Sequence, residues 1–177
     1  DRAAEEISRA FPGFPVVISA GDVIKEKVES KPSLVLATPG AQPLVDEGYA
    51  AVVVLDTTRF FSHTDINSQE RARELIFETS SLIRPSGKVL LVIDDSHPIV
   101  AAVARWNIAP MLKRELADRA DLNLPPTVTS AVLVLDATSA PSIAAGLNKA
   151  KLEGRLPSST RLFGPTQLPK SQAKIVI

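Results

Sequence analysis

Hydrophobic and polar positions follow two alternating patterns along the first half of the chain. Short charged stretches such as residues 2–10 separate apolar runs such as 33–38 and 50–56. Continuous apolar runs are typical of strands that are buried on both faces, because helices cover both sides of a parallel sheet. The pattern therefore predicts an α/β domain with a parallel sheet over residues 1–96.

The same patterns place the individual elements of this half. Gly and Pro pairs such as Pro12-Gly13 and Pro39-Gly40 mark the breaks between them. The segment up to Ile66 is expected to be irregular, and the helix that follows is expected to be capped by Asn67 or Ser68 and ended by Pro85 and Gly87. We expect helices at 2–10, 22–29 and from 67 or 68 onward, strands at 15–19, 33–38, 50–56 and 88–93, and a helical region at 98–122 with a break near 106–110.

The stretch from Lys113 to Leu135 joins a charged amphipathic helix to a strand. Pro125 and Pro126 cannot continue a helix, and the residues after them are β-branched or aliphatic. This pattern fits a junction between two domains, and it also fits a helix–strand junction inside one α/β domain.

Beyond the two prolines the pattern predicts a strand, a helix and two further strands, at 127–136, 139–154, 160–163 and 173–177. A β-α-β-β run is most of a ferredoxin-like unit, which needs one more helix and strand to close. We therefore expect the chain to be a fragment whose last domain is cut short.

Composition excludes several classes of site. The chain has no cysteine, so it has neither disulfides nor thiolate zinc ligands, and its two histidines, His63 and His97, lie far apart. No apolar run approaches the roughly 20 residues of a membrane span, and the N-terminus does not resemble a signal peptide. We expect a soluble, cytoplasmic protein without a membrane partner.

Charge is distributed unevenly along the chain. Residues 1–96 hold ten lysines and arginines against fifteen acidic residues, whereas 97–177 hold ten against five. A basic end can mark a nucleic-acid surface, although a solvated helix face and loop would have the same composition. The candidate DNA-binding residues are Lys149, Lys151, Arg155, Arg161, Lys170 and Lys174.

No complete phosphate-binding motif is present. The chain lacks Gly-x4-Gly-Lys-Ser/Thr, and Ser86-Gly87-Lys88 precedes a predicted strand where such a loop should follow one. Two predicted strands end in acid, at Asp56 and Asp94, which suits either Mg²⁺ ligands at a sheet edge or ordinary helix caps.

Four short motifs resemble, in order and spacing, the PriA family of replication-restart helicases (primosomal protein N′). They are Ala-Phe-Pro-Gly at 10–13, Leu-Pro-Pro at 124–126, Phe-Gly-Pro at 163–165 followed by Pro-Lys at 169–170, and the series Asp56, Asp65, Ser68, Glu70 and Arg71. The resemblance covers nearly the whole chain. It implies a second helicase lobe with a RecA-like parallel sheet, followed by the start of the C-terminal domain.

The departures from the family pattern concern the ATP site. Of the Gly-Thr-Gln-Met loop of active members only Thr38 remains, and the two arginines that touch the γ-phosphate fall on Leu82 and Pro85, one position from Arg84. Loss of such an arginine costs on the order of 10³–10⁵ in rate. Thr38 and Arg84 are therefore the candidates for ATP contacts. The resemblance also implies a degenerate, zinc-less member without catalysis in this chain, and ATP and Mg²⁺ would belong to the full-length protein.

The resemblance implies three regions: a RecA-like helicase lobe at 1–96, a helical connector at 97–124 and a truncated ferredoxin-like domain at 125–177. It implies a role in recognising stalled forks and assembling the primosome. The implied partners are forked or single-stranded DNA, single-strand-binding protein and other primosome proteins. Two alternatives stay open: a stand-alone doubly wound enzyme that uses Asp56 and Asp94 around Mg²⁺, and a protein-interaction module whose acidic first half binds partners.

Overall fold

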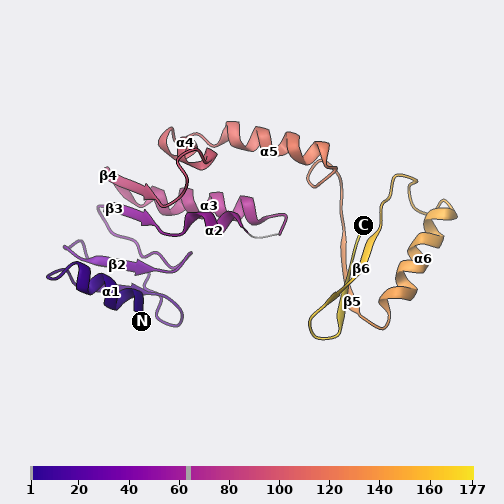
Figure 1. The fold of residues 1–177 in the computed structure, drawn as a ribbon, viewed down its shortest axis with the longest axis horizontal. Helices are drawn as coiled ribbons and strands as arrows, with labels where there is room; N and C mark the ends of the chain where they lie inside the picture. Colours follow the sequence, from indigo (N-terminus) through magenta and orange to yellow (C-terminus); the bar gives the residue numbers. More distant parts are fainter. Residues whose placement is uncertain (1, 63–64) are drawn as a thin grey trace. The chain divides into compact units, whose positions relative to one another are not determined.

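The computed structural model describes residues 2–62 and 65–177 (Figure 1). The chain divides into two compact units, Asp1–Met111 and Leu112–Ile177. The division falls inside the predicted 97–124 connector, and the predicted domain limits at 96 and 124 stay predictions. His63 lies outside the described residues.

The first unit mixes helices with short strands. The predicted helix at 2–10 and the strands near 15–19, 33–38 and 50–56 are confirmed with bounds shifted by one or two residues. In chain order the elements are α1 (Arg2–Ala10), β1 (Val16–Ser19), β2 (Leu34–Ala37), β3 (Tyr49–Val54), α2 (Thr57–Phe61), α3 (Ser68–Ser81), β4 (Ile83–Leu91), α4 (Pro98–Ala104) and the beginning of α5 (Ala109–Asp121).

The strands of this unit pair in parallel. β1 lies beside β2 from Val16↔Leu34 to Ser19↔Ala37, and β3 lies beside β4 from Ala51↔Lys88 to Val54↔Leu91. The described strands thus form two small two-stranded sheets. A mixed α/β unit with parallel pairing, as the apolar runs predict, is what the structure contains.

One face of the β3–β4 pair packs inside the unit and the other does not. Val52 and Val54 are buried together with Ile76 of α3, whereas Val53 and Leu90 are each more than half exposed. The expectation that these strands are covered on both faces is wrong for the described residues. Alternation of side chains along a strand directs Val53 and Leu90 away from α3.

The start of β4 corrects the predicted end of the preceding helix. The helix ends at Ser81, and Pro85 and Gly87 belong to β4 instead. The backbone of Tyr49 donates to Leu82 O at 2.8 Å, and the pairing of Tyr49 with Ile83 draws the chain onto β3. A Cβ on Gly87 would lie 2.8 Å from Tyr49 O, so only glycine fits this approach.

Two further segments of the first unit differ from expectation. Residues 22–29 are not helical, because Val28 N donates to Leu44 O and Leu44 N donates to Glu26 O in a bridge to a distant strand-like segment. The stretch expected to be irregular contains α2, whose buried Thr57 donates its hydroxyl to Val54 O at 2.9 Å.

The second unit contains the remainder of α5 and a three-stranded antiparallel sheet. Its elements are β5 (Val132–Asp136), α6 (Ala140–Leu152), β6 (Phe163–Leu168) and β7 (Gln172–Val176). The order is β5-β7-β6, so β7 lies between the other two strands and is antiparallel to both. The predicted succession of strand, helix, strand and strand is confirmed.

The middle strand of that succession lies later than predicted, at 163–168 and not at 160–163. Gly164 makes this possible, because a Cβ there would be 2.6 Å from Lys174 O of the neighbouring strand. The sequence pattern places Gly164-Pro165 in a loop, but in the structure both residues belong to β6. The first strand is shorter than predicted, since Thr127 N donates back to Leu124 O in a turn.

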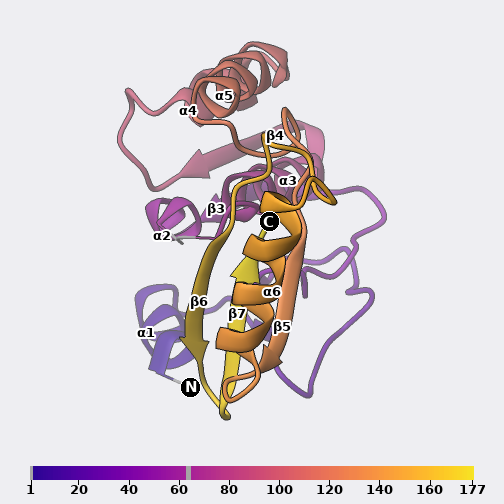
Figure 2. The same ribbon diagram turned by 90° about the vertical axis from the view of Figure 1, so that its right-hand side faces the viewer.

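The helix α6 covers one face of this sheet (Figure 2). Ala140 of the helix and Ala173 and Ile175 of β7 are buried between them. Among residues 2–62 and 65–177, no helix has the length and apolar content to cross a membrane.

Candidate nucleic-acid interface

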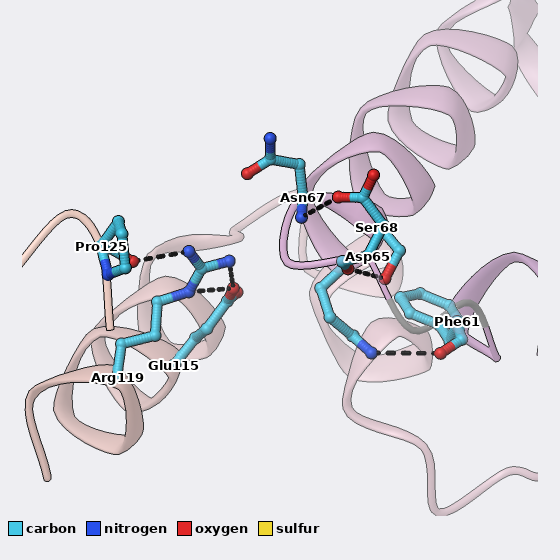
Figure 3. A network of polar contacts seen from close by, with 8 residues as sticks. Phe61, Asp65, Asn67, Ser68, Glu115, Arg119 and Pro125 are labelled. Atoms are coloured by element: carbon cyan, nitrogen blue, oxygen red, sulfur yellow. Dashed lines mark hydrogen bonds and ion pairs between the residues drawn. The ribbon is translucent and has the colours of Figure 1, made fainter. Parts of the chain in front are cut away.

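Two residues of the Asp65–Arg71 motif, Asp65 and Ser68, lie beside Asn67 at the start of α3 (Figure 3). The Asp65 carboxylate accepts from Asn67 N at 2.8 Å and lies 3.0 Å from Arg71 Nη2, while its carbonyl accepts from Ser68 Oγ at 2.7 Å. Asn67 is the N-cap residue but its side chain makes no cap bond. In this chain the motif builds a helix start.

The two candidate ATP contacts belong to different parts of the first unit. Thr38 follows β2; its amide donates to Ser19 O and its carbonyl accepts from Ala41 N. Arg84 is an exposed residue near the beginning of β4. No hydrogen bond or ion pair joins them in the described part of the chain, and the residue after Thr38 is Pro39, which has no amide hydrogen to offer a phosphate.

A cavity of about 240 Å³ lies between β2, β3 and α3. It is mostly apolar, and its polar groups are engaged: Tyr49 Oη donates to Pro43 O at 2.7 Å, and Gln42 Nε2 donates to Thr79 Oγ1 at 2.9 Å. Burial raises the pKa of Tyr49. Neither Thr38 nor Arg84 lines this cavity.

The two aspartates that follow β3 and β4 have different local environments. Asp56 has a left-handed φ of 50° before α2. Asp94 accepts from Ser96 N and Oγ at 2.9 and 2.6 Å, and these hydrogen bonds hold its pKa below the usual value. No group of three or more Asp, Glu, His or Cys side chains suited to a metal is found in the described residues.

His97, and not the Asp94–Ser96 segment, caps α4. Its Nδ1 accepts from Ile99 N at 3.3 Å, and its ring lies 4.6 Å from that of Phe61. Burial lowers the pKa of His97, against the attraction of Asp94. The interpretation of Asp94 as the cap of this helix is therefore wrong, although the helix begins at Pro98 as expected.

Three of the candidate DNA-binding residues, Lys149, Lys151 and Arg155, lie at or just after the C-terminal end of α6. Each contacts Glu153 or Thr160. Lys149 Nζ lies 3.8 Å from Glu153 Oε1, and Arg155 Nη2 lies 2.6 Å from Glu153 Oε2. Lys151 Nζ donates to Thr160 O at 2.6 Å. These contacts and the helix dipole give the three residues a local structural role.

The other three candidates border the sheet of the second unit. Arg161 precedes β6, Lys170 lies in the turn between β6 and β7, and Lys174 is in the middle of β7. All three are exposed, and none forms an ion pair with another described residue. The structure thus separates the six predicted residues into three that have a partner in the chain and three that form no ion pair among the described residues.

The sheet face opposite α6 is the part of this surface that sequence reasoning missed. Lys174 pairs with Val134 and Thr166, and Val176 pairs with Val132 and Phe163, so these side chains share one face. Phe163 is 59% exposed, and Val132 and Val134 are each 54% exposed. The sequence signal was the alternation of Ala173, Lys174 and Ile175 in β7, which directs Lys174 to the face opposite its two apolar neighbours.

In comparisons with known proteins, the chain aligns with about a quarter of the length of larger proteins. No family model matches it. It is 38% identical over 172 residues to the probable replication restart protein PriA of Mycobacterium leprae, which covers 96% of this chain and 25% of that protein. It is also 38% identical over 176 residues to the protein of the same name from Mycobacterium tuberculosis (strain CDC 1551 / Oshkosh), covering 95% of this chain and 26% of the relative.

Proposed function

Because this chain is homologous to about a quarter of replication restart protein PriA, we propose that it supplies a DNA-binding part of a replication-restart protein. The observation that carries the proposal is the exposed group of Arg161, Lys170 and Lys174 around one small sheet, without acidic partners among the described residues. Cations of this kind bind phosphates without reading sequence.

The substrate would be forked or single-stranded DNA at a stalled fork. The acidic first half would repel a nucleic acid, so contact falls to the second unit. Single-strand-binding protein and other primosome proteins are the proposed protein partners, in keeping with a role in primosome assembly. Lys149, Lys151 and Arg155 would contribute a weaker, secondary attraction, because Glu153 neutralises part of the charge of Lys149 and Arg155 and Lys151 already donates to Thr160 O.

We propose that the first unit is a RecA-like second helicase lobe and that the second unit is a ferredoxin-like domain. Parallel pairing of β1 with β2 and of β3 with β4 supports the first. The position of β7 between β5 and β6 supports the second, because a split β-α-β unit has an antiparallel strand inserted between two parallel ones.

We further propose that this polypeptide has no ATP site of its own. ATP and Mg²⁺ are implied by the resemblance, but the residues present do not fit them: neither Thr38 nor Arg84 lines the cavity between β2, β3 and α3, and Pro39 stands where a phosphate loop presents amides. Helicase turnover would be absent from this chain.

The test is a salt titration of binding to labelled forked and single-stranded DNA. We expect Arg161→Ala/Lys170→Ala/Lys174→Ala to weaken binding and to lower the slope of log K against log salt by roughly 0.7 for each lost contact to a single strand. The matched control, Lys25→Ala/Arg59→Ala/Arg105→Ala, removes the same charge from exposed sites of the first unit. Equal effects of the two triple variants would show that only net charge matters and would contradict the proposed surface.

A further inference from the structure

The outer face of the β5-β7-β6 sheet carries an exposed aromatic ring near an exposed lysine. Phe163 and Val132 flank Val176 in one row across the sheet, and Val134 and Thr166 flank Lys174 in the next. The opposite face holds the buried Ala173 and Ile175 under α6. The exposed face is therefore the one that α6 leaves uncovered.

We propose that this face binds single-stranded DNA, with a base stacked on the ring of Phe163 and a phosphate held by Lys174. The inference rests on the proposed DNA-binding function and adds a second type of contact to it. Stacking on an aromatic ring is independent of sequence because every base has a π face.

Charge identifies the occupant as a nucleic acid. Arg161 lies two residues before Phe163, Lys170 lies in the turn after β6, and Lys174 occupies the central strand of the face itself. The acidic residue of this face, Asp136, stands in the row of Gln172, two rows from Phe163. Protein–protein interface cores are depleted of lysine, whereas single-strand-binding sheets combine cations with aromatic rings.

An exposed ring on a sheet selects unpaired bases. Bases inside a duplex are stacked on one another, so a flat aromatic surface reaches them only where the strand is single. Val132 and Val134 on β5, across the central strand β7 from the ring, provide further exposed apolar area on the same face for a neighbouring base and sugar. The proposed ligand is therefore the single-stranded arm of a fork or a gap.

The experiment measures binding of the full chain to a fluorescein-labelled oligothymidylate of about 16 nucleotides. Phe163→Leu keeps an apolar side chain and removes the ring; we expect binding to be roughly 5- to 150-fold weaker. The slope against salt should not change, because no cation is lost. Phe163→Trp should bind at least as tightly as wild type, and Leu152→Ala, which truncates an 89% exposed apolar residue on α6, should bind like wild type.

A second probe of equal length without bases separates stacking from phosphate contact. Wild type should bind the abasic strand more weakly than oligothymidylate, and Phe163→Leu should bind the two alike. Wild-type affinity of Phe163→Leu for oligothymidylate would overturn the stacking proposal and leave the cation-based function standing. Absence of wild-type binding to any strand would overturn both. A wild-type dimer that becomes monomeric in Phe163→Leu, by light scattering, would assign the face to a second copy and also overturn the proposal.

Discussion

The guanidinium of Arg119 joins the last turns of α5 to the proline corner that precedes β5. Its Nη1 donates to Pro125 O at 2.8 Å, while Nη2 lies 2.7 Å from Glu115 Oε1 (Figure 3). Both side chains are largely buried, at 14% and 20% exposure. The arginine and the two prolines that mark this junction in the sequence are thus parts of one contact.

Replacing Arg119 with methionine keeps the aliphatic stem and removes these donors. We expect the second unit to lose about 1–3 kcal/mol, because the Glu115 carboxylate and the Pro125 carbonyl lose a charged donor in a partly buried place. Urea unfolding measures the change. The exposed Arg114→Met is the control and should stay within about 0.5 kcal/mol of wild type; equal losses in the two variants would show that the Arg119 contact adds no stability.

Alanine at two glycines should change stability in opposite directions. Gly87→Ala places a Cβ 2.8 Å from Tyr49 O and 2.9 Å from Ile83 Cβ, so we expect a loss of about 1–3 kcal/mol. Gly146→Ala lies in α6, where nothing other than the adjacent backbone of the helix itself is within 4 Å of the new Cβ, and should gain about 0.5–1 kcal/mol. Thermal unfolding of both variants checks the pair, and a stabilising Gly87→Ala would contradict the close approach of β4 to β3.

The stability of the first unit should depend on the protonation of His97. Burial lowers its pKa below the ordinary value of 6.5, so the unfolded chain binds the proton more readily than the folded one. The contribution of His97 to the free energy of unfolding is therefore fully present above pH 6.5 and is lost as the pH falls toward the lowered pKa. Protonation would also remove the acceptor for Ile99 N.

Thermal unfolding at about pH 7.5 and about pH 5.5 tests this dependence. His97→Asn keeps a cap acceptor that does not titrate in this range, so the difference between the two pH values should be smaller in the variant. Asp94, whose pKa is lowered, acts in a separate window, because its contribution is lost only below its ordinary value of 3.8. An unchanged pH dependence in His97→Asn would rule out His97 as the titrating group.

Asp65 should matter more than its ion-pair partner Arg71. Asp65→Ala removes the acceptor of Asn67 N as well as the ion pair, and we expect a loss of about 0.5–2 kcal/mol. Arg71→Ala removes an exposed ion pair and should cost about 0–1 kcal/mol. Denaturant titration of both single variants and the double variant gives the coupling; a larger loss in Arg71→Ala than in Asp65→Ala would be inconsistent with the helix-start role of the motif.

The chain alone should release no phosphate from ATP, with or without DNA. Thr38 follows β2, Arg84 belongs to β4 in the other sheet, and neither residue lines the cavity between β2, β3 and α3, so the two do not form a triphosphate site there. A coupled phosphate-release assay on wild type and Arg84→Ala checks this. DNA-stimulated phosphate release that disappears in Arg84→Ala would show that Arg84 contacts the γ-phosphate during catalysis and would refute the prediction.

Local sequence patterns were sufficient to predict many of the secondary-structure elements. Apolar runs located β1, β2, β3, β5 and β7, because burial of a strand requires apolar side chains at most positions. Proline and glycine located most of the breaks, and the spacing of a few motifs pointed to the family to which the homologues of this chain belong.

Long-range pairing decided the rest. Pro85, Gly87 and Gly164 look like loop residues in the sequence, but close approach of a neighbouring strand includes them in β4 and β6. Residues 22–29 have a helical pattern that the bridge to Leu44 overrides. Pairing between strands far apart in the chain is invisible to a local pattern.

The candidate site shows the same division. Composition alone located the basic end and all six of its cations. Only the tertiary structure showed that Glu153 and Thr160 bind three of them, and that Phe163 and Lys174 share the face that α6 leaves uncovered. The physical reason is that the sequence records which charges and rings are present, whereas strand register and helix packing determine which of them face solvent together.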